Sequence, residues 1–216
     1  KNEISVFFDI GTNGELVIGN KEFLLCGAGA AGPALEGGVV RTGMRADAGA
    51  VDEVRIRDGN IFVHVIGNSA PQGICGSGII DLIAELFLEG WIDIRGKLSP
   101  EKSPLIQERD NQLCVKYAPG LYFYQKDIDE FIRTKSAAHT MVEIMLRESG
   151  LDLNQADRFY VAGAFGKHVS KESAIAIGMY PDMDRDHIIN AGNSSLEGAQ
   201  KLLLNRSLLT DIDQIL

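Results

Sequence analysis

The sequence predicts an α/β fold, with a mixed sheet of about five strands and helices on both faces of the sheet. Two runs of apolar, β-branched and aromatic residues, at 4–8 and 159–162, have the composition of buried strands. Each is followed by a glycine-bearing turn. The stretch from Asp127 to Glu148 has apolar residues at helical spacing. Strand patterns and helix patterns therefore both contribute to the predicted core.

The first strand ends near a carboxylate and is followed by a glycine-rich turn. Asp9 and Ile10 precede Gly11-Thr12-Asn13-Gly14, and Leu16 to Ile18 then indicate a returning strand. Such a tip offers backbone N–H groups, a hydroxyl and an amide to an anion, while Asp9 can hold Mg²⁺ through water. An ordinary hairpin remains the alternative, because Asn-Gly is a strong hairpin signal without any ligand.

A third strand is expected over Phe23 to Cys26, and it runs into a glycine-rich segment. Residues 27–32 satisfy the GxGxxG pattern of dinucleotide-binding folds. That fold requires a long helix after the glycines, whereas Gly37-Gly38 follows Pro33 to Glu36 at once. We therefore favour close packing of a short helix against the sheet over NAD binding.

The middle of the chain predicts a second hairpin and a buried helix. Residues 51–57 and 61–66 alternate around Asp58-Gly59-Asn60, a turn sequence. Gly76-Ser77-Gly78 then opens a helix that Gly90 can end. Its glycine-rich start is either an anion site or a serine-capped terminus, and we favour the structural interpretation.

An irregular insertion is expected around residues 94–125. Residues 94–111 have the charges and prolines of a surface loop, and residues 114–124 form a pair of short strands broken at Pro119-Gly120. The longest helix should follow from Asp127, which with Glu130 resembles a capping box. Lys135 on this helix is interpreted as a solvated lysine.

The last third of the sequence predicts a strand, then a glycine turn, then a helix. The strand at 159–162 stops at Gly163-Ala164-Phe165-Gly166, and a helix should start near Ser170. A flat adenine can approach backbone there without meeting side chains. Residues 187–191 indicate a further strand, and Ser194 with Glu197 forms a capping box for a helix to Leu204.

Composition excludes several classes of partner. The 216 residues carry a net charge of −9, which argues against nucleic acid and anionic membrane surfaces. The three cysteines are far apart and lack CxxC spacing, so we expect a reducing cytoplasm. The four histidines show no metal-ligand spacing, and no apolar run reaches the roughly 18 residues of a membrane span. We also find no signal peptide.

Four motifs together resemble a known family. The loop at 9–15 resembles a phosphate loop of the acetate and sugar kinase, Hsp70 and actin superfamily. More closely, the chain is similar to the carboxy-terminal ATPase region of reductive activators of corrinoid proteins. The motifs that carry this resemblance are Asp9 to Glu15, Gly32 to Gly37, Gly73 to Asp81 and Val161 to Gly166.

The resemblance implies that residues 1–216 form the second lobe of an actin-like, ribonuclease H-like ATPase. Asp9 would be the catalytic residue, orienting water or holding Mg²⁺ through water. The phosphates of ATP would meet Gly11, Thr12, Asn13 and Gly14, and the adenosine would meet Gly163, Ala164, Phe165 and Gly166. Ala164 departs from the adjacent glycines usual in the adenosine motif.

The resemblance also implies an activity of a larger protein. A 2Fe–2S cluster in an amino-terminal domain outside this chain would pass an electron to cob(II)alamin, driven by ATP hydrolysis. The partner would be a corrinoid protein or a corrinoid-dependent methyltransferase, and a homodimer is conceivable. The chain starts just before a strand, so we expect a piece of a longer protein that binds ATP weakly alone and lacks the activity. An acetate- or sugar-kinase-type phosphotransferase lobe and a non-catalytic dimerisation or docking lobe remain alternatives.

Overall fold

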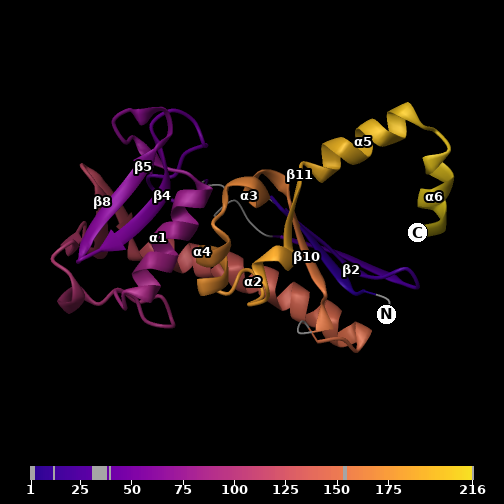
Figure 1. Cartoon of the computed structure of the whole chain (residues 1–216). Coiled ribbons are helices and arrows are strands. Elements are labelled where there is room, and N and C mark those ends of the chain that lie inside the picture. Colours follow the sequence, from indigo (N-terminus) through magenta and orange to yellow (C-terminus); the bar gives the residue numbers. More distant parts are fainter. Residues whose placement is uncertain (1–2, 12, 31–37, 39, 153–154, 216) are drawn as a thin grey trace.

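The computed structural model describes residues 3–11, 13–30, 38, 40–152 and 155–215. A five-stranded mixed sheet has the order β11-β10-β1-β2-β3, and two three-stranded sheets have the orders β5-β4-β6 and β7-β8-β9. Figure 1 shows the five-stranded sheet in one half of the molecule and the small sheets with α1 in the other, with α2 extending between them. The expected mixed α/β fold is confirmed.

The central sheet places the two expected strands next to each other. Strand β1 (Ser5–Ile10) is parallel to β10 (Arg158–Ala162), which is parallel to β11 (Ile188–Gly192). On its other side β1 is antiparallel to β2 (Asn13–Gly19). Side chains alternate along β1, so that Phe8 and Ile10 are buried on one face and Asp9 lies half-buried on the other.

The glycine run after Cys26 belongs to strand β3 (Leu24–Ala30), which is antiparallel to β2. A Cβ atom added to Gly27 would lie 2.4 Å from Met145 Sδ, and one added to Gly29 would lie 2.8 Å from Met141 Sδ. Both methionines belong to α2 (Gln125–Ser149). These glycines thus allow close packing between this long helix and the strand, and they do not start a dinucleotide-binding helix. The short helix expected at 33–36 lies outside the described residues.

The second hairpin is confirmed. Strands β4 (Ala50–Arg57) and β5 (Asn60–Val65) pair around Asp58 and Gly59, which both have positive φ. The short β6 (Gly73–Ile74) leads into α1 (Gly76–Leu88), whose residues are buried over most of its length. Gly90, with φ of 67°, follows the last turn as expected.

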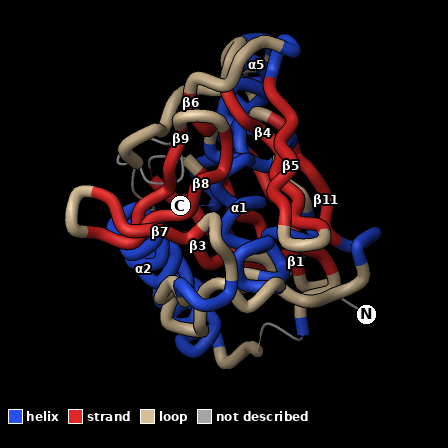
Figure 2. Tube along the Cα trace, turned by 90° about the vertical axis from the view of Figure 1, so that its left-hand side faces the viewer, coloured by secondary structure: helices blue, strands red, loops and turns tan. Residues whose placement is uncertain are grey.

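Part of the expected surface loop is regular structure, which corrects the prediction. Strands β7 (Ile106–Arg109), β8 (Gln112–Ala118) and β9 (Leu121–Tyr124) form an antiparallel sheet. Trp91, Ile92, Leu98 and Ile106 belong to the hydrophobic core. The pair of strands expected at 114–124 is confirmed, and Figure 2 shows α2 beside this sheet.

Helix α2 begins two residues earlier than Asp127. The Asp127 carboxylate accepts hydrogen bonds from the backbone N–H groups of Tyr124 at 2.9 Å and Arg41 at 3.2 Å. Asp127 therefore caps the helix from its third position, where a carboxylate also suits the helix dipole. Gly150, in the left-handed conformation, ends the helix.

The C-terminal part contains α3 (Gly163–His168), α4 (Lys171–Ala176), α5 (Ser194–Leu204) and α6 (Leu208–Ile215). Ser170 caps α4, where a helix was expected to start, but the glycine turn expected before it is itself the short helix α3. Figure 1 shows α5 and α6 extending away from the sheet. Leu203 and Leu204 on α5 are 85% and 80% exposed. None of the helices in the described residues is long and apolar enough to cross a bilayer.

Candidate functional site

Asp9 lies where β1 approaches its end, opposite Ala162 in the parallel neighbour β10. Its Oδ2 atom accepts hydrogen bonds from Ser194 Oγ at 3.0 Å and Ser195 Oγ at 3.3 Å. Both hydroxyls come from the first turn of α5. Two neutral donors can orient a carboxylate without neutralising it, so the charge of Asp9 remains available to a cation.

Gly163 is the first residue after β10 and lies against Asp9. Its φ of 84° is in the region that favours glycine, and an added Cβ would lie 2.6 Å from Asp9 Oδ1 and 2.7 Å from the Ile10 carbonyl oxygen. The structure therefore brings the first and last sequence motifs together. It also explains why the residue at 163 must lack a side chain.

A cavity of about 470 Å³ opens beside these two residues. Asp9, Gly11 and Gly163 line it on the side of the large sheet. Ile10, residues 44–46 and 75–77, and His168 and Val169 complete the described lining. The cavity thus lies between the end of the large sheet and the start of α1.

The turn at the tip of the first hairpin is shorter than expected. Strand β1 extends to Ile10 and β2 already begins at Asn13, so Asn13 and Gly14 belong to a strand. Gly14 pairs with Ile10 and Gly29, and the Gly11 N–H donates to the Asn13 carbonyl oxygen at 2.9 Å. Thr12 lies outside the described residues. Of the predicted phosphate-binding residues, Asp9 and Gly11 line the cavity.

The predicted adenosine motif forms the start of helix α3, which begins at Gly163. A Cβ on Gly166 would lie 2.7 Å from the Val161 carbonyl oxygen, so the glycine allows this turn to pack on its own strand. The Asn190 side chain donates to the Gly166 carbonyl oxygen at 2.6 Å. The side chains of Ala164 and Phe165 lie outside the described residues.

Several residues that line the cavity or are hydrogen-bonded to Asp9 were not singled out as site residues from the sequence. Ser194 was expected to cap α5, but Asn193 does so by accepting from the Leu196 N–H at 3.0 Å, which leaves the Ser194 hydroxyl for Asp9. Cys75 and Ser77 line the cavity at the start of α1, where the glycine-rich motif was an available signal. Arg45, in a polar loop, had no such signal.

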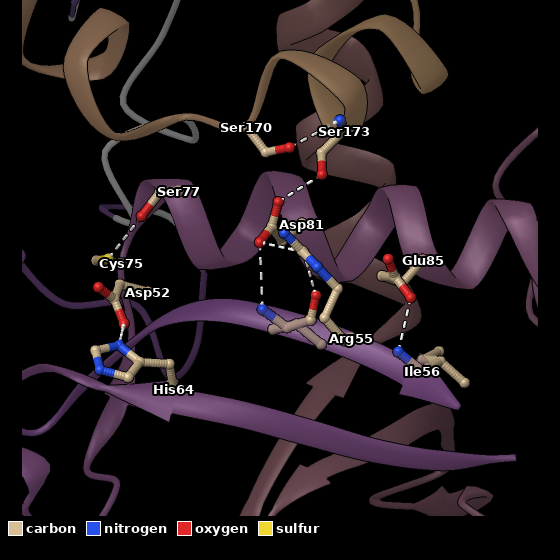
Figure 3. Close-up of polar contacts among 11 residues, drawn as sticks. Asp52, Arg55, Ile56, His64, Cys75, Ser77, Asp81, Glu85, Ser170 and Ser173 are labelled. Atoms are coloured by element: carbon tan, nitrogen blue, oxygen red, sulfur yellow. Dashed lines mark hydrogen bonds and ion pairs between the residues drawn. The ribbon is translucent and has the colours of Figure 1, made fainter. Parts of the chain in front are cut away.

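A buried polar cluster fixes α1 in this position (Figure 3). Asp81 on α1 is 2% exposed. It accepts hydrogen bonds from the Arg55 side chain at 2.6 Å, the Val54 N–H at 3.3 Å and the Ser173 hydroxyl at 2.5 Å. Arg55 and Val54 belong to β4 and Ser173 to α4, so one carboxylate joins α1, β4 and α4.

Asp9 at the cavity suits a metal ion whose other ligands are waters and phosphates. Within the described residues, no group of three or more histidine, cysteine or acidic side chains could hold a metal ion. Mg²⁺ in nucleotide sites is bound by one or two carboxylates, with waters and phosphates as the remaining ligands. Asp9 fits that pattern as a single carboxylate at the rim of a cavity.

Comparison with known proteins connects this arrangement to one family. A family model described as the C-terminal domain of RACo, the ASKHA domain, matches residues 3–216. The solved structure of a "Reductive activator for corrinoid,iron-sulfur protein" is 39% identical, with a TM-score of 0.89, and the match covers 100% of this chain and 36% of that one.

Two curated relatives are similar over nearly the whole chain. The corrinoid activation enzyme RamQ of Eubacterium limosum is 33% identical, over 94% of this chain and 37% of the relative. The Co(II) methylated amine-specific corrinoid protein reductase of Methanosarcina barkeri is 28% identical, over 99% of this chain and 41% of the relative. The chain thus spans about two fifths of the length of these curated relatives.

Proposed function

The chain belongs to the family of C-terminal ASKHA domains of RACo, and on this premise we propose that it is the ATP-binding part of a reductive activator of a corrinoid protein. In the whole protein, ATP hydrolysis would accompany transfer of one electron from a 2Fe–2S cluster outside this chain to the Co(II) centre of the partner. The lobes of the ATPase would change their arrangement when ATP binds and is hydrolysed. The free energy of nucleotide binding would then drive an electron transfer that is unfavourable alone.

The contact between Asp9 and Gly163 is the observation that carries this proposal. It places a carboxylate and a side-chain-free backbone turn at one edge of a cavity of about 470 Å³. Ligand sites are typically concave spaces of about 300 to 1,000 Å³ with a few polar groups. A Cβ at 163 would intrude on the carboxylate, which explains the glycine. The carboxylate at the edge of the cavity suits a nucleotide and its metal.

The residues of this chain would have distinct roles in binding ATP. Asp9 would hold Mg²⁺ through water or orient the attacking water, with Ser194 and Ser195 fixing its orientation. Phosphate oxygens would lie at Gly11, Thr12, Asn13 and Gly14. The side chains of Thr12 and Asn13 would be the donors there, because the Gly11 N–H already donates to the Asn13 carbonyl oxygen. The N–H groups at the start of α1 would add to them. Residues 163–166 would face the adenosine.

Replacement of Asp9 in the full-length protein tests the proposal. For Asp9→Asn we expect ATP hydrolysis to fall by about a hundredfold or more, because the neutral amide binds hydrated Mg²⁺ more weakly than a carboxylate and does not accept a proton. Reduction of the corrinoid partner, followed by the light absorption of its Co(I) form, should fall by the same factor. ATP binding should persist, since the amide keeps the size and hydrogen bonds of the side chain.

Asp58→Asn is the matched control, because Asp58 lies in an exposed turn that asparagine tolerates. Unchanged ATP turnover and corrinoid reduction in Asp9→Asn would contradict the proposal. ATP turnover that requires a small hydroxyl or carboxylate acceptor, and no corrinoid partner, would instead indicate a phosphotransferase.

A further inference from the structure

A second and larger cavity lies on the opposite face of β1 from Asp9. Its volume is about 850 Å³. Phe8 and Ile10 of β1 and Phe159 of β10 line it on the side of the sheet, and Ala138, Val142 and Leu146 line it on the side of α2. Protein interiors are close-packed, so a space of this size between a helix and a sheet is open for a ligand.

Lys135 is one of the cationic side chains that line this cavity. Lys135 on α2 is half-buried, and it takes part in no hydrogen bond or ion pair within the described part of the chain. Burial lowers the pKa of its ammonium group, with no carboxylate to offset the effect. By contrast, His139 and Glu143 at the same cavity lie 3.8 Å apart as a pair.

The Lys135 ammonium group lies near the loop across from α2. A Cβ added to Gly178 would lie 3.5 Å from Lys135 Nζ, and Gly178 has a φ of 68°. Met179 and Tyr180 continue the wall of the cavity from this glycine. Lys135 lines this cavity together with the ionisable side chains of His139, Glu143, Arg147 and Asp152, and most of the remaining lining is apolar.

We propose that this cavity binds a small organic anion with an apolar body, of the fatty-acid type, with its carboxylate at Lys135 and its hydrocarbon chain between α2 and the sheet. An unpaired, partly desolvated ammonium group is stabilised by an anion. The apolar walls contribute through burial of the hydrocarbon chain. The site is independent of the nucleotide proposal, because Lys135 and the other α2 side chains that define it do not line the cavity beside Asp9, although Ile10 lines both cavities.

Calorimetric titration of the 216-residue chain with octanoate, decanoate and 1-octanol tests this site. Two added methylene groups should tighten binding about tenfold between octanoate and decanoate. Lys135→Gln should weaken octanoate binding about tenfold and leave 1-octanol binding unchanged. Ala138→Phe should abolish binding of all three, because the larger side chain fills the cavity.

Lys201→Gln, an exposed lysine on α5, is the control and should bind all three compounds like the parent chain. Circular dichroism confirms that each variant is folded before titration. The proposal is overturned if octanoate does not bind the parent chain, if Lys135→Gln binds octanoate as tightly as the parent, or if binding survives in folded Ala138→Phe.

Discussion

Gly163 and Asp9 are in direct contact across the ends of two parallel strands, with 2.6 Å between Asp9 Oδ1 and the position that a Cβ at 163 would take. Gly163→Ala should therefore displace the Asp9 carboxylate in addition to straining a backbone with φ of 84°. We expect ATP binding by the full-length protein to fall at least tenfold. The unfolding free energy should fall by about 1–3 kcal/mol.

The matched control is Gly120→Ala, because Gly120 has a φ of 74° and nothing within 4 Å of an added Cβ. It shares the backbone strain without the contact. ATP titration and urea unfolding of both variants separate the two effects. Equal loss of ATP affinity in both variants would show that the contact with Asp9 has no role in the site.

The hydrogen bond between Ser173 and Asp81 should contribute strongly to stability because both side chains are buried. Asp81→Ala leaves the Ser173 hydroxyl and the Val54 N–H without this acceptor, and should lower the unfolding free energy by about 2–4 kcal/mol. Ser173→Ala should cost about 1–2 kcal/mol, since it leaves one lone pair of a charged group unsatisfied.

A double-mutant cycle on these two residues, measured by urea unfolding, isolates their interaction. The double variant should be less destabilised than the sum of the single variants, by at least about 1 kcal/mol. Simple additivity would mean that Asp81 acts through Arg55 and β4 alone.

Two glycines in helices should respond to alanine in opposite directions. A Cβ on Gly78 of α1 would lie 2.3 Å from the Val51 carbonyl oxygen, whereas one on Gly198 of α5 would meet nothing within 4 Å. Gly78→Ala should lower the unfolding free energy by about 2 kcal/mol or more, because the helix must move away from β4. Gly198→Ala should raise it by about 0.5–1 kcal/mol through helix propensity. A thermal unfolding midpoint that rises for Gly78→Ala would contradict the packing seen at α1.

The ion pair between His64 and Asp52, with 2.6 Å between Nδ1 and Oδ1, should make stability depend on pH. Asp52 raises the pKa of His64 above its ordinary value of 6.5, so the folded state binds the proton more tightly than the unfolded state. The contribution of the pair is complete below about pH 6.5 and is lost as pH rises through the raised pKa.

We therefore expect the difference in unfolding free energy between the parent chain and His64→Gln to shrink between about pH 6 and pH 8. Urea unfolding at several pH values measures this difference. Asp52→Asn removes the partner and keeps the histidine. The difference in unfolding free energy between the parent chain and Asp52→Asn should also shrink between about pH 6 and pH 8. A difference that grows with pH would show that the pair does not stabilise the charged histidine.

Local sequence rules were sufficient where the local chain decides the structure. The turn at Asp58 and Gly59 predicted the second hairpin, and the spacing of apolar residues predicted α2 to within two residues at its start. Strand β7 was missed because Ile106–Arg109 is short and charged, and its structure depends on pairing with β8.

At the candidate site, too, local sequence rules did not predict contacts between residues far apart in the chain. Asn193 and Ser194 are both good caps, and the choice between them depends on a carboxylate that is 185 residues away along the chain. The roles of residues 11–14 and 163–166 in nucleotide binding stay predictions. The sequence motifs could indicate that Asp9 and Gly163 matter, but only the parallel pairing of β1 with β10 brings them into contact.

The packing of α2 on β3 has a mechanical consequence. One end of this 25-residue helix follows β9, and farther along Met141 and Met145 rest over Gly29 and Gly27. A change of angle between the large sheet and the β7–β9 sheet must then either bend the helix or slide its two thioether side chains along the bare backbone of β3. Either movement keeps the two thioether side chains against the bare backbone of Gly27 and Gly29. A side chain at either position would obstruct this contact and push the helix away from the large sheet.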